Sequence, residues 1–281
     1  MNATGERFIP QDMDGQISVE HFSRYLFANN YIDLRGKTVL DIASGTGYGS
    51  SIMAQTAKQV TGVDISQEAV DYANTHYAND KLTFLKGDCC NIPISDNSID
   101  VIVSFETIEH IDRHEEFLSE IKRVLTPDGV VIISSPNKRL YSDVPQRINP
   151  YHLKELYNEE FQSLLSRHFS HTLYLGQSYQ LSSVIYPISN LSQPLRRPTE
   201  YRDNNILDKE PLYNIIIASN ASLTTLKPLP AAFFYEDTVT IDFLQNKAFE
   251  EGRLSCKKTM PWKLGHYLIS PFRFIKRLLH K

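Results

Sequence analysis

Several features that would mark a specialised protein are scarce in this chain of 281 residues. It has three cysteines, two of them adjacent (Cys89 and Cys90), which is too few for a disulfide framework and suits a reducing compartment. No stretch approaches the ~18 consecutive apolar residues of a membrane span. The first residues, MNATGERF, lack the apolar core of a signal peptide. We therefore expect a cytoplasmic protein.

An excess of positive charge is also missing. Lysine and arginine total 29 against 33 aspartates and glutamates, so the net charge is -4, and the pI is about 6.1. A dedicated nucleic-acid binder would carry a basic face, so we expect no nucleic-acid partner. The sequence shows no internal repeat, and its length suffices for one good-sized core with an appendage.

The most informative stretch covers residues 39–50, VLDIASGTGYGS. A short apolar run ends in an acid, Asp41, and is followed by three glycines at alternate positions, Gly45, Gly47 and Gly49. This pattern is typical of a buried strand that ends in a loop before a helix, and glycine lets the loop approach a ligand closely. A phosphate-binding loop is excluded because no Lys-Ser/Thr pair follows, and a serine breaks the dinucleotide pattern G-x-G-x-x-G at its sixth position.

Two further acids follow later apolar runs. Asp64 closes the run VTGVDIS, and Asp88 follows the run LTFLKGDCC. The step from Asp41 to Asp64 is the one at which a second parallel strand brings a carboxylate to a ribose diol. We therefore expect these acids at one edge of a sheet, although a strand-end cap or turn role is the alternative for each of them.

Strands and helices alternate along the first half of the chain. We predict strands at 37–43, 59–64, 82–86, 99–104 and 129–135, and helices at 48–57, 67–78 and 113–125. A turn at 126–129, a helix at 151–168 with Leu153 and Leu156 on its inner face, and an antiparallel strand pair at 169–175 and 212–219 should follow. The pattern predicts an α/β fold with a mostly parallel sheet that binds ligands beyond the carboxyl ends of its strands.

The segment before the first strand is predicted to hold a loop and a helix. Residues 1–17 suit either a lid over a ligand or a flexible leader. In the helix that follows, we expect an apolar stripe of Val19, Phe22, Leu26 and Phe27, with Arg24 on another face.

The order of these motifs, together with IDVIVSFETIEHI at 99–111, resembles the class I S-adenosylmethionine (SAM) dependent methyltransferases. More narrowly, TGERFIP, VEHFSRYLFA and NPYHLKELYNEEF resemble the methyltransferases of bacterial O-antigen and capsule assembly. The resemblance implies a Rossmann-like domain at 37–220 with a seven-stranded sheet. A lid and helix at 1–36, a substrate-covering insertion at 177–210 and an extension at 221–281 complete the expected organisation.

The resemblance implies SAM as the cofactor and S-adenosylhomocysteine as the product. Gly45 and Gly47 would approach the methionine part, and Asp64 would bind the ribose hydroxyls. Asp88 would meet the adenine amino group, and Arg24 would clamp the SAM carboxylate unless it is only a solvated helix residue. The cofactor site would be completed by Asp41, Ala43, Ile65, Cys89 and Phe105.

Methyl transfer from a sulfonium needs no acid for its leaving group, but a hydroxyl acceptor needs a base. His110, in FETIEHI, and His152, in NPYHLKEL, are the candidate bases, although a lone histidine is more often structural. Glu106 and Glu109 could orient the base or the substrate. We predict no metal site, because Glu109, His110, Asp112 and His114 are close in sequence but give no complete ligand geometry.

The narrow resemblance implies that the acceptor is a sugar, a sugar phosphate or a lipid-linked glycan of a bacterial surface polysaccharide, methylated on a hydroxyl, an amine or a phosphate. Residues 270–281 form an amphipathic, basic helix pattern that suits an anionic membrane surface, with docking on a protein surface as the alternative. A lipophilic acceptor such as a quinone precursor, or a SAM-binding scaffold without activity, remains possible. A charged glycan would favour basic residues near the substrate, such as Arg139, Arg147, Arg196 or Arg197.

Overall fold

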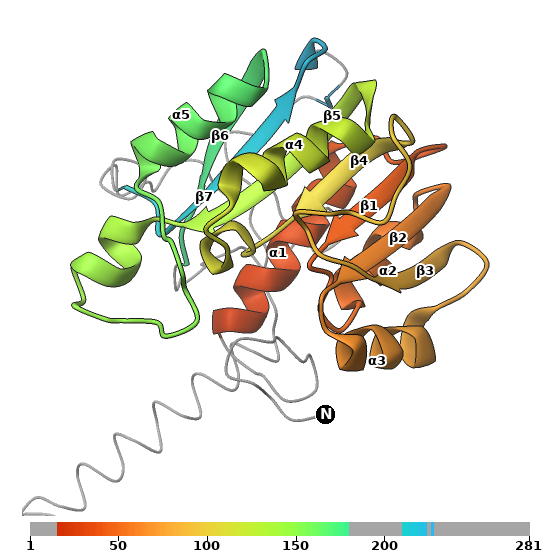
Figure 1. Ribbon diagram of the computed structural model, residues 1–281, viewed down its shortest axis with the longest axis horizontal. Helices are drawn as coiled ribbons and strands as arrows, with labels where there is room; N and C mark the ends of the chain where they lie inside the picture. Colours follow the sequence, from red (N-terminus) through yellow and green to blue (C-terminus); the bar gives the residue numbers. More distant parts are fainter. Residues whose placement is uncertain (1–15, 180–209, 224–225, 228–281) are drawn as a thin grey trace, which may run out of the picture. The chain divides into compact units, whose positions relative to one another are not determined.

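The computed structural model describes residues 16–179, 210–223 and 226–227 (Figure 1). The described residues from Glu20 onward belong to one compact unit, and Gln16–Val19 belong to a second. Residues 1–15 of the predicted lid, most of the predicted insertion (180–209) and the predicted helix at 270–281 lie outside the described residues. The three-part division of the chain therefore stays a prediction.

Seven strands form one sheet with the order β3-β2-β1-β4-β5-β7-β6. They are β1 (Thr38–Ile42), β2 (Gln59–Asp64), β3 (Leu82–Lys86), β4 (Ile99–Ser104), β5 (Leu125–Pro136), β6 (His171–Gln177) and β7 (Tyr213–Ser219). Strands β1 to β5 pair in parallel, whereas β7 runs antiparallel to both β5 and β6. The predicted α/β fold with a mostly parallel seven-stranded sheet is confirmed.

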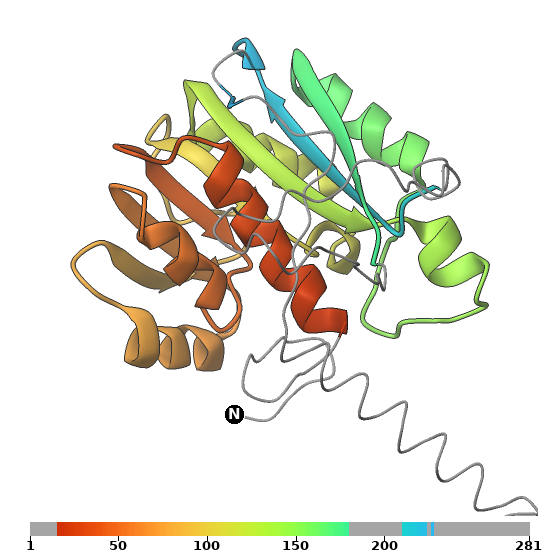
Figure 2. The same ribbon diagram turned by 180° about the vertical axis from the view of Figure 1, so that it is seen from behind.

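Helices cover both faces of this sheet (Figures 1 and 2). On one face lie α1 (Gln16–Tyr31), α2 (Tyr48–Ala54) and α3 (Gln67–Tyr77), and on the other lie α4 (His114–Val124) and α5 (Asn158–His168). Two short turns, η1 (Ile108–His110) and η2 (Arg139–Asp143), follow β4 and β5. Because helices cover both faces, the central strands are mostly apolar, and Leu40, Ile102 and Val131 are fully buried.

The first helix buries a different face from the one predicted. Phe22, Leu26 and Phe27 are only half-buried, whereas Arg24 and Tyr25 are buried. The prediction that the apolar stripe forms the inner face of α1 is therefore wrong. The physical reason is that α1 packs polar side chains against the carboxyl ends of the strands, where they form hydrogen bonds.

Two predictions about irregular segments are also wrong. The helix predicted at 151–168 begins only at Asn158, and Leu153 is 68% exposed. The backbone N–H groups of Leu153 and Lys154 donate to the carbonyl of Glu109, so tertiary hydrogen bonds replace those of a helix. Residues 126–129 lie inside β5, although α4 does end at Val124 before them.

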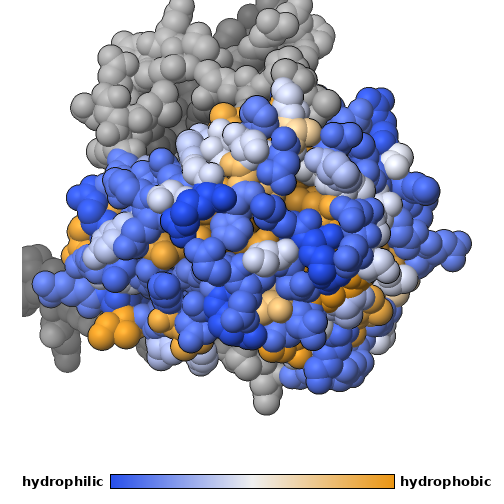
Figure 3. Space-filling model, turned by 45° about the horizontal axis from the view of Figure 1, so that its top comes forward, coloured by the Kyte–Doolittle hydropathy of each residue, from blue (hydrophilic) through white to orange (hydrophobic). Residues whose placement is uncertain are grey.

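Hydrophilic side chains predominate on the face of the described residues shown in Figure 3. Among the described helices, none combines the length and the apolar character needed to cross a membrane.

Candidate functional site

The loop after β1 turns through three residues with positive φ angles, Ala43 (59°), Gly45 (54°) and Gly47 (87°). A methyl side chain at Gly45 would meet nothing within 4 Å, whereas one at Gly47 would lie 2.7 Å from the ring of Phe84. Gly47 also caps α2 in a left-handed conformation. Gly45 therefore presents bare backbone to open space, as a ligand requires, and Gly47 allows α2 to pack closely against the sheet.

Asp64 ends β2 and supports the glycine loop from the neighbouring strand. Its Oδ2 accepts a hydrogen bond from the N–H of Gly45 (2.8 Å), and its Oδ1 accepts one from the N–H of Ser66 (2.9 Å). Each carboxylate oxygen can accept a second bond, so the predicted contact with a ribose diol remains open to Asp64. The next side chain, Ile65, is 70% exposed, as an apolar wall for adenine must be before the ligand binds.

Asp41 lies beneath the loop rather than at its surface. It is fully buried, and the hydroxyls of Ser50 (2.6 Å) and Tyr25 (3.2 Å) each donate to one of its oxygens. Burial raises the pKa of Asp41 to about 7. Phe105, after β4, is also buried and packs edge-to-face on Tyr25 at 5.0 Å. Both residues support the predicted cofactor site from below, and a direct contact with SAM stays a prediction.

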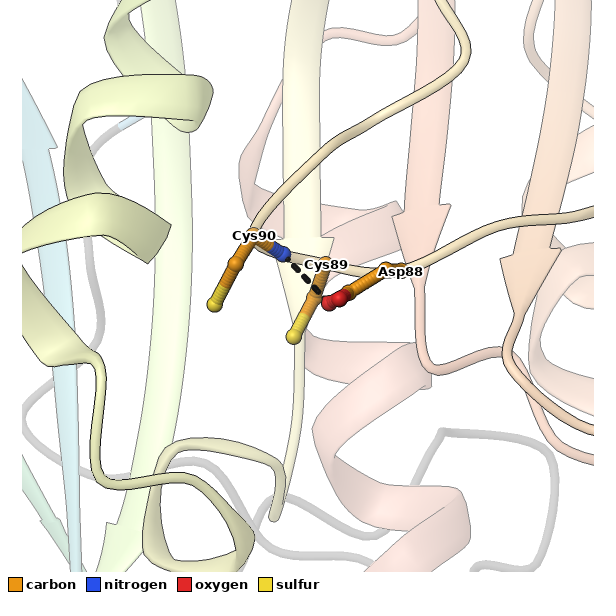
Figure 4. A group of neighbouring side chains, drawn as sticks. All are labelled: Asp88, Cys89 and Cys90. Carbon is orange, nitrogen blue, oxygen red and sulfur yellow. Dashed lines mark hydrogen bonds between the residues drawn. The ribbon is translucent and has the colours of Figure 1, made fainter.

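Asp88, Cys89 and Cys90 form a tight turn after β3 (Figure 4). Asp88 accepts a hydrogen bond from the N–H of Cys90 (2.8 Å) and forms an ion pair with Arg113 (2.9 Å). These two contacts hold its pKa below the usual range. Burial raises the pKa of the Cys89 thiol to about 12, so Cys89 is a neutral side chain at pH 7. Arg113 is a partner that the sequence analysis missed.

Arg24 is 1% exposed, which excludes the solvated helix arginine. Its Nε donates to Oε1 of Gln177 (2.7 Å), its Nη2 lies 3.6 Å from Oε1 of Glu106, and its guanidinium lies 4.5 Å over the ring of Tyr213. The remaining nitrogen, Nη1, has no hydrogen-bond partner among the described residues. A buried cation with a spare donor fits an anionic ligand group, and the SAM carboxylate that the resemblance assigns to Arg24 is such a group.

The turn after β4 places two acids near this arginine. Glu106 has a positive φ angle of 51°, its N–H donates to Oγ of Ser134 (3.0 Å), and the same hydroxyl donates to its Oε1 (2.6 Å). Glu109 is 1% exposed, and its Oε2 has no hydrogen-bond partner among the described residues. Burial, with the charge of Glu106 next, raises the pKa of Glu109 well above its usual range. Glu109 is therefore a buried carboxyl group that lacks a partner for one oxygen.

His110 follows Glu109 and is held by the backbone of a distant loop. Its Nδ1 lies 3.0 Å from the carbonyl oxygen of Tyr151, and its Nε2 lies 4.0 Å from Oε1 of Glu109. Because a carbonyl oxygen only accepts hydrogen bonds, Nδ1 carries a proton, and the neutral ring has its lone pair on Nε2.

His152 lies in the same loop and meets His110 edge-to-face, with the ring centroids 4.9 Å apart. Its Nδ1 lies 2.5 Å from Oε1 of Glu155, and its Nε2 lies 2.9 Å from Nδ2 of Asn149. The carboxylate of Glu155 therefore fixes the proton on Nδ1, as in His110, and Nε2 accepts the hydrogen bond from the Asn149 amide.

Glu109, His110 and His152 come together in the fold, with one potential ligand atom from each within 4.8 Å of the other two. This trio is not apparent among the sequence neighbours of Glu109 alone. One of those neighbours, His114, is buried and its Nε2 bonds to the carbonyls of Ile108 and Ile111 (both 2.9 Å), which makes it structural. No periodicity links residues 109 and 152, so pattern alone could not have found the trio.

Comparisons with known proteins bear on residues 40–133, which match the family model described as a methyltransferase domain. The chain is 35% identical over 170 residues to a Mycobacterium tuberculosis protein described as a probable S-adenosylmethionine-dependent methyltransferase. This match covers 59% of the chain and 60% of that protein. The chain is also 30% identical over 123 residues to the phthiotriol/phenolphthiotriol dimycocerosates methyltransferase of M. tuberculosis, covering 43% of the chain and 46% of that protein. The matched part thus spans less than two thirds of either relative.

The fold has a counterpart among solved structures. The crystal structure of a SAM dependent methyltransferase from Archaeoglobus fulgidus matches with a TM-score of 0.51 at 19% identity, covering 72% of this chain and 92% of that one. The family match runs from β1 into β5, and it includes the glycine loop, Asp64, Asp88 and the turn at 105–110. Residues 40–133 therefore match a methyltransferase domain, and S-adenosylmethionine is the cofactor named for the relatives that the chain resembles.

Proposed function

We propose that the protein transfers a methyl group from SAM to a hydroxyl oxygen. The observation that carries the proposal is the histidine and glutamate trio, Glu109, His110 and His152. Glu109 and His110 follow the carboxyl end of β4, which pairs in parallel with β1, so these two residues and the glycine loop follow neighbouring strand ends. A phosphate or carboxylate acceptor needs no proton-accepting group, whereas a hydroxyl does, and the trio supplies one.

Each residue has a defined task in this reaction. SAM supplies an electrophilic methyl group, whose bond to sulfur breaks as a bond to the acceptor oxygen forms. Arg24 and Asp64 hold the cofactor, and the chain keeps water from the methyl group. The hydroxyl proton passes to the trio. His110 is the member best placed to receive it, because its side chain is 30% exposed whereas that of His152 is 5% exposed.

A sugar or sugar phosphate of a surface polysaccharide, free or lipid-linked, is the acceptor that we favour. The narrow sequence resemblance supports it, and so does the charge near the trio. Arg147 lies 5.7 Å over the ring of Tyr141, which in turn stacks on His152 at 5.2 Å. Arg139 is paired with Glu210. An arginine separated from the trio by one ring suits an acceptor that carries a phosphate.

A lipophilic acceptor is the second candidate. The observation in its favour is the likeness to the mycobacterial dimycocerosates methyltransferase, whose name indicates a lipid acceptor. A quinone precursor falls in the same class. The third possibility, a scaffold that binds SAM without transferring its methyl group, predicts SAM binding with no product from any acceptor.

The test uses SAM carrying a labelled methyl group. We expect the full chain to label nucleotide sugars or lipid-linked glycans, with the label on oxygen by mass spectrometry, and to leave quinone precursors unlabelled. His110→Ala should lose the labelling, while His76→Ala, a change at an exposed histidine on α3, should keep it. Labelling of lipophilic acceptors alone would favour the second candidate, and SAM binding without labelling of any acceptor would contradict the proposed reaction.

We also propose that the protein works in the cytoplasm and can lie against the anionic inner face of the cell membrane. The support is the basic amphipathic pattern of residues 270–281. Deletion of 270–281 should release the protein from anionic vesicles in a sedimentation assay. Equal partitioning of the full chain and the truncated chain would contradict the membrane proposal.

A further inference from the structure

We propose that Glu109, His110 and His152 bind a divalent transition-metal ion of the Mn²⁺, Co²⁺ or Zn²⁺ class, and that this ion activates the acceptor hydroxyl. The catalytic part rests on the proposed function, whereas metal binding can be measured without it. In this arrangement His110 is a metal ligand instead of the free base.

The ligand atoms are suitable in kind and in position. Two imidazole nitrogens and one carboxylate oxygen form a set that first-row divalent ions favour, whereas Mg²⁺ and Ca²⁺ prefer oxygen ligands. The three atoms lie within 4.8 Å of one another. Ligand atoms on one ion lie at most about 4.2 Å apart, twice a metal–nitrogen bond of about 2.1 Å. Side-chain movements on the order of 1 Å or less would therefore close the trio on an ion.

The hydrogen bonds around the two histidines are those of metal ligands. A metal-bound histidine usually donates its other N–H to a carboxylate or a backbone carbonyl, which fixes the tautomer and the ring orientation. Nδ1 of His152 has the carboxylate of Glu155 as its partner, and Nδ1 of His110 has the carbonyl of Tyr151. Both rings consequently have a lone pair on Nε2, and a bound ion would displace the Asn149 amide that donates to Nε2 of His152.

Charge and burial also favour a cation at this position. Glu109 is buried with one carboxyl oxygen lacking a partner, and such groups in folded proteins call for an explanation. A further carboxyl group, that of Glu155, lies 2.5 Å from Nδ1 of His152. A divalent ion would supply the partner that the buried oxygen of Glu109 lacks, and its charge would offset these carboxyl groups.

A bound ion would perform the step for which a hydroxyl acceptor needs help. A divalent ion lowers the pKa of an oxygen bound to it, so the acceptor can lose its proton to water near neutral pH. With three protein ligands, the ion keeps positions open for substrate oxygens. An acceptor with two adjacent hydroxyls, such as a sugar diol, could fill two of these positions. The inferred substrate class is therefore a vicinal diol.

A second group of possible ligands fits a metal less well. Asp88, Cys89 and Cys90 also lie within range of one another (Figure 4). The oxygens of Asp88 already face Arg113 and the N–H of Cys90, and Cys89 and Cys90 are neighbours in one turn. Because the thiolate is the metal-binding form, the raised pKa of both thiols also disfavours a metal at this turn.

The first experiment measures metal binding alone. Full-length protein is stripped with a chelator and titrated with Mn²⁺, and free Mn²⁺ is followed by electron paramagnetic resonance. We expect one ion per chain, with affinity at least tenfold weaker in Glu109→Gln and His152→Gln. The same loss is expected in Glu155→Gln, which removes the carboxylate that faces Nδ1 of His152. His76→Gln and Asp88→Asn are the matched controls and should bind Mn²⁺ like the wild type. Circular dichroism and a thermal unfolding midpoint like those of the wild type show that each variant is folded.

Three outcomes would overturn the metal site. These are no binding of Mn²⁺, Co²⁺ or Zn²⁺ by the wild type, equal affinity in the Glu109 and His152 variants, and loss of binding only in the Asp88 variant.

The second experiment separates this inference from the proposed function. Chelation should lower turnover by ~100-fold or more and leave SAM affinity unchanged, and added Mn²⁺ or Zn²⁺ should restore turnover. Full turnover in chelator would make the metal inference wrong while the methyltransferase function stands. Metal binding at the trio without methylation of any acceptor would contradict the proposed reaction and support the metal site.

Discussion

The loops after β1, β2 and β3 differ from the turn after β4 in how their acids are satisfied. In the first region, the carboxylates of Asp41, Asp64 and Asp88 each have donors for both oxygens. In the second, one carboxyl oxygen of Glu109 has no hydrogen-bond partner among the described residues. The same holds for the nitrogen Nη1 of the nearby Arg24. The acids of the first region are thus satisfied within the chain itself, whereas the second region has a buried acid and a buried cation that a ligand can satisfy.

This difference indicates how the protein divides its work. Asp64 accepts hydrogen bonds from the backbone of Gly45 and Ser66 and so holds the glycine loop in shape, and the cofactor meets a preformed surface. Buried groups without partners cost stability, and proteins tolerate that cost chiefly at functional sites. The turn after β4 is consequently where we expect substitutions to affect chemistry more than folding.

The largest expected effect is a change of the free energy of unfolding with pH that is caused by Asp41. Its pKa is about 7 in the folded protein and about 3.9 in an unfolded chain. Because folding raises this pKa, the stability that Asp41 contributes is full below pH 4 and is lost as the pH rises to 7, by about 4 kcal/mol. As the pH is raised from 4 to 7, urea unfolding should show that the free energy of unfolding of Asp41→Asn increases relative to that of the wild type.

Asp41→Asn must be compared with the wild type because His21 gives the stability of both the opposite pH dependence. Burial lowers the pKa of His21 to about 3, so its contribution is lost as the pH falls. This effect is common to the wild type and the variant. Parallel stability curves from pH 4 to 7 would show that Asp41 does not titrate in this range.

The second prediction tests the region with unsatisfied groups. His110→Ala should lower turnover by ~100-fold or more, because the hydroxyl loses either its base or a metal ligand. Calorimetry should show SAM affinity within twofold of the wild type, since His110 contacts Tyr151 and Glu109 and lies outside the glycine loop. A fall of less than threefold would point to a phosphate acceptor or to His152 as the base.

The third prediction concerns two glycines of the satisfied region. Gly47→Ala places a methyl group 2.7 Å from Phe84 at a φ of 87°, so thermal unfolding should show a loss of about 2 to 3 kcal/mol. Gly45→Ala has a φ of 54° but open space, so about 1 kcal/mol should be lost. Gly45→Ala should instead weaken SAM binding. Equal stability of the two variants would mean that packing at Gly47 relaxes.

The smallest effect is expected at Asp64. Asp64→Ala should weaken SAM binding about tenfold in calorimetry, because charge-assisted hydrogen bonds to the ribose are lost and the N–H of Gly45 loses its acceptor. Asp71→Ala, on the exposed side of α3, is the control and should bind SAM normally. Unchanged affinity in the Asp64 variant would remove this residue from the cofactor site.

Much of the sheet could be predicted because its signals are local. Apolar runs marked β1, β2, β3 and β4 to within a residue or so, and the glycines marked the loop before α2. Arg24 could be named from the resemblance, but its burial could not. Its neighbours Glu106, Gln177 and Tyr213 come from three distant segments, and helical periodicity carries no information about them.

By itself, the sequence determined the parallel α/β sheet, the glycine loop and the acids at the strand ends, because each depends on a short pattern along the chain. Only the tertiary structure decided that α1 buries polar side chains, that residues 151–157 are not helical, and that Glu109, His110 and His152 meet. The physical reason is that these outcomes depend on hydrogen bonds and charges between distant segments. Such interactions override local helix preference, and they exist only once the chain has folded.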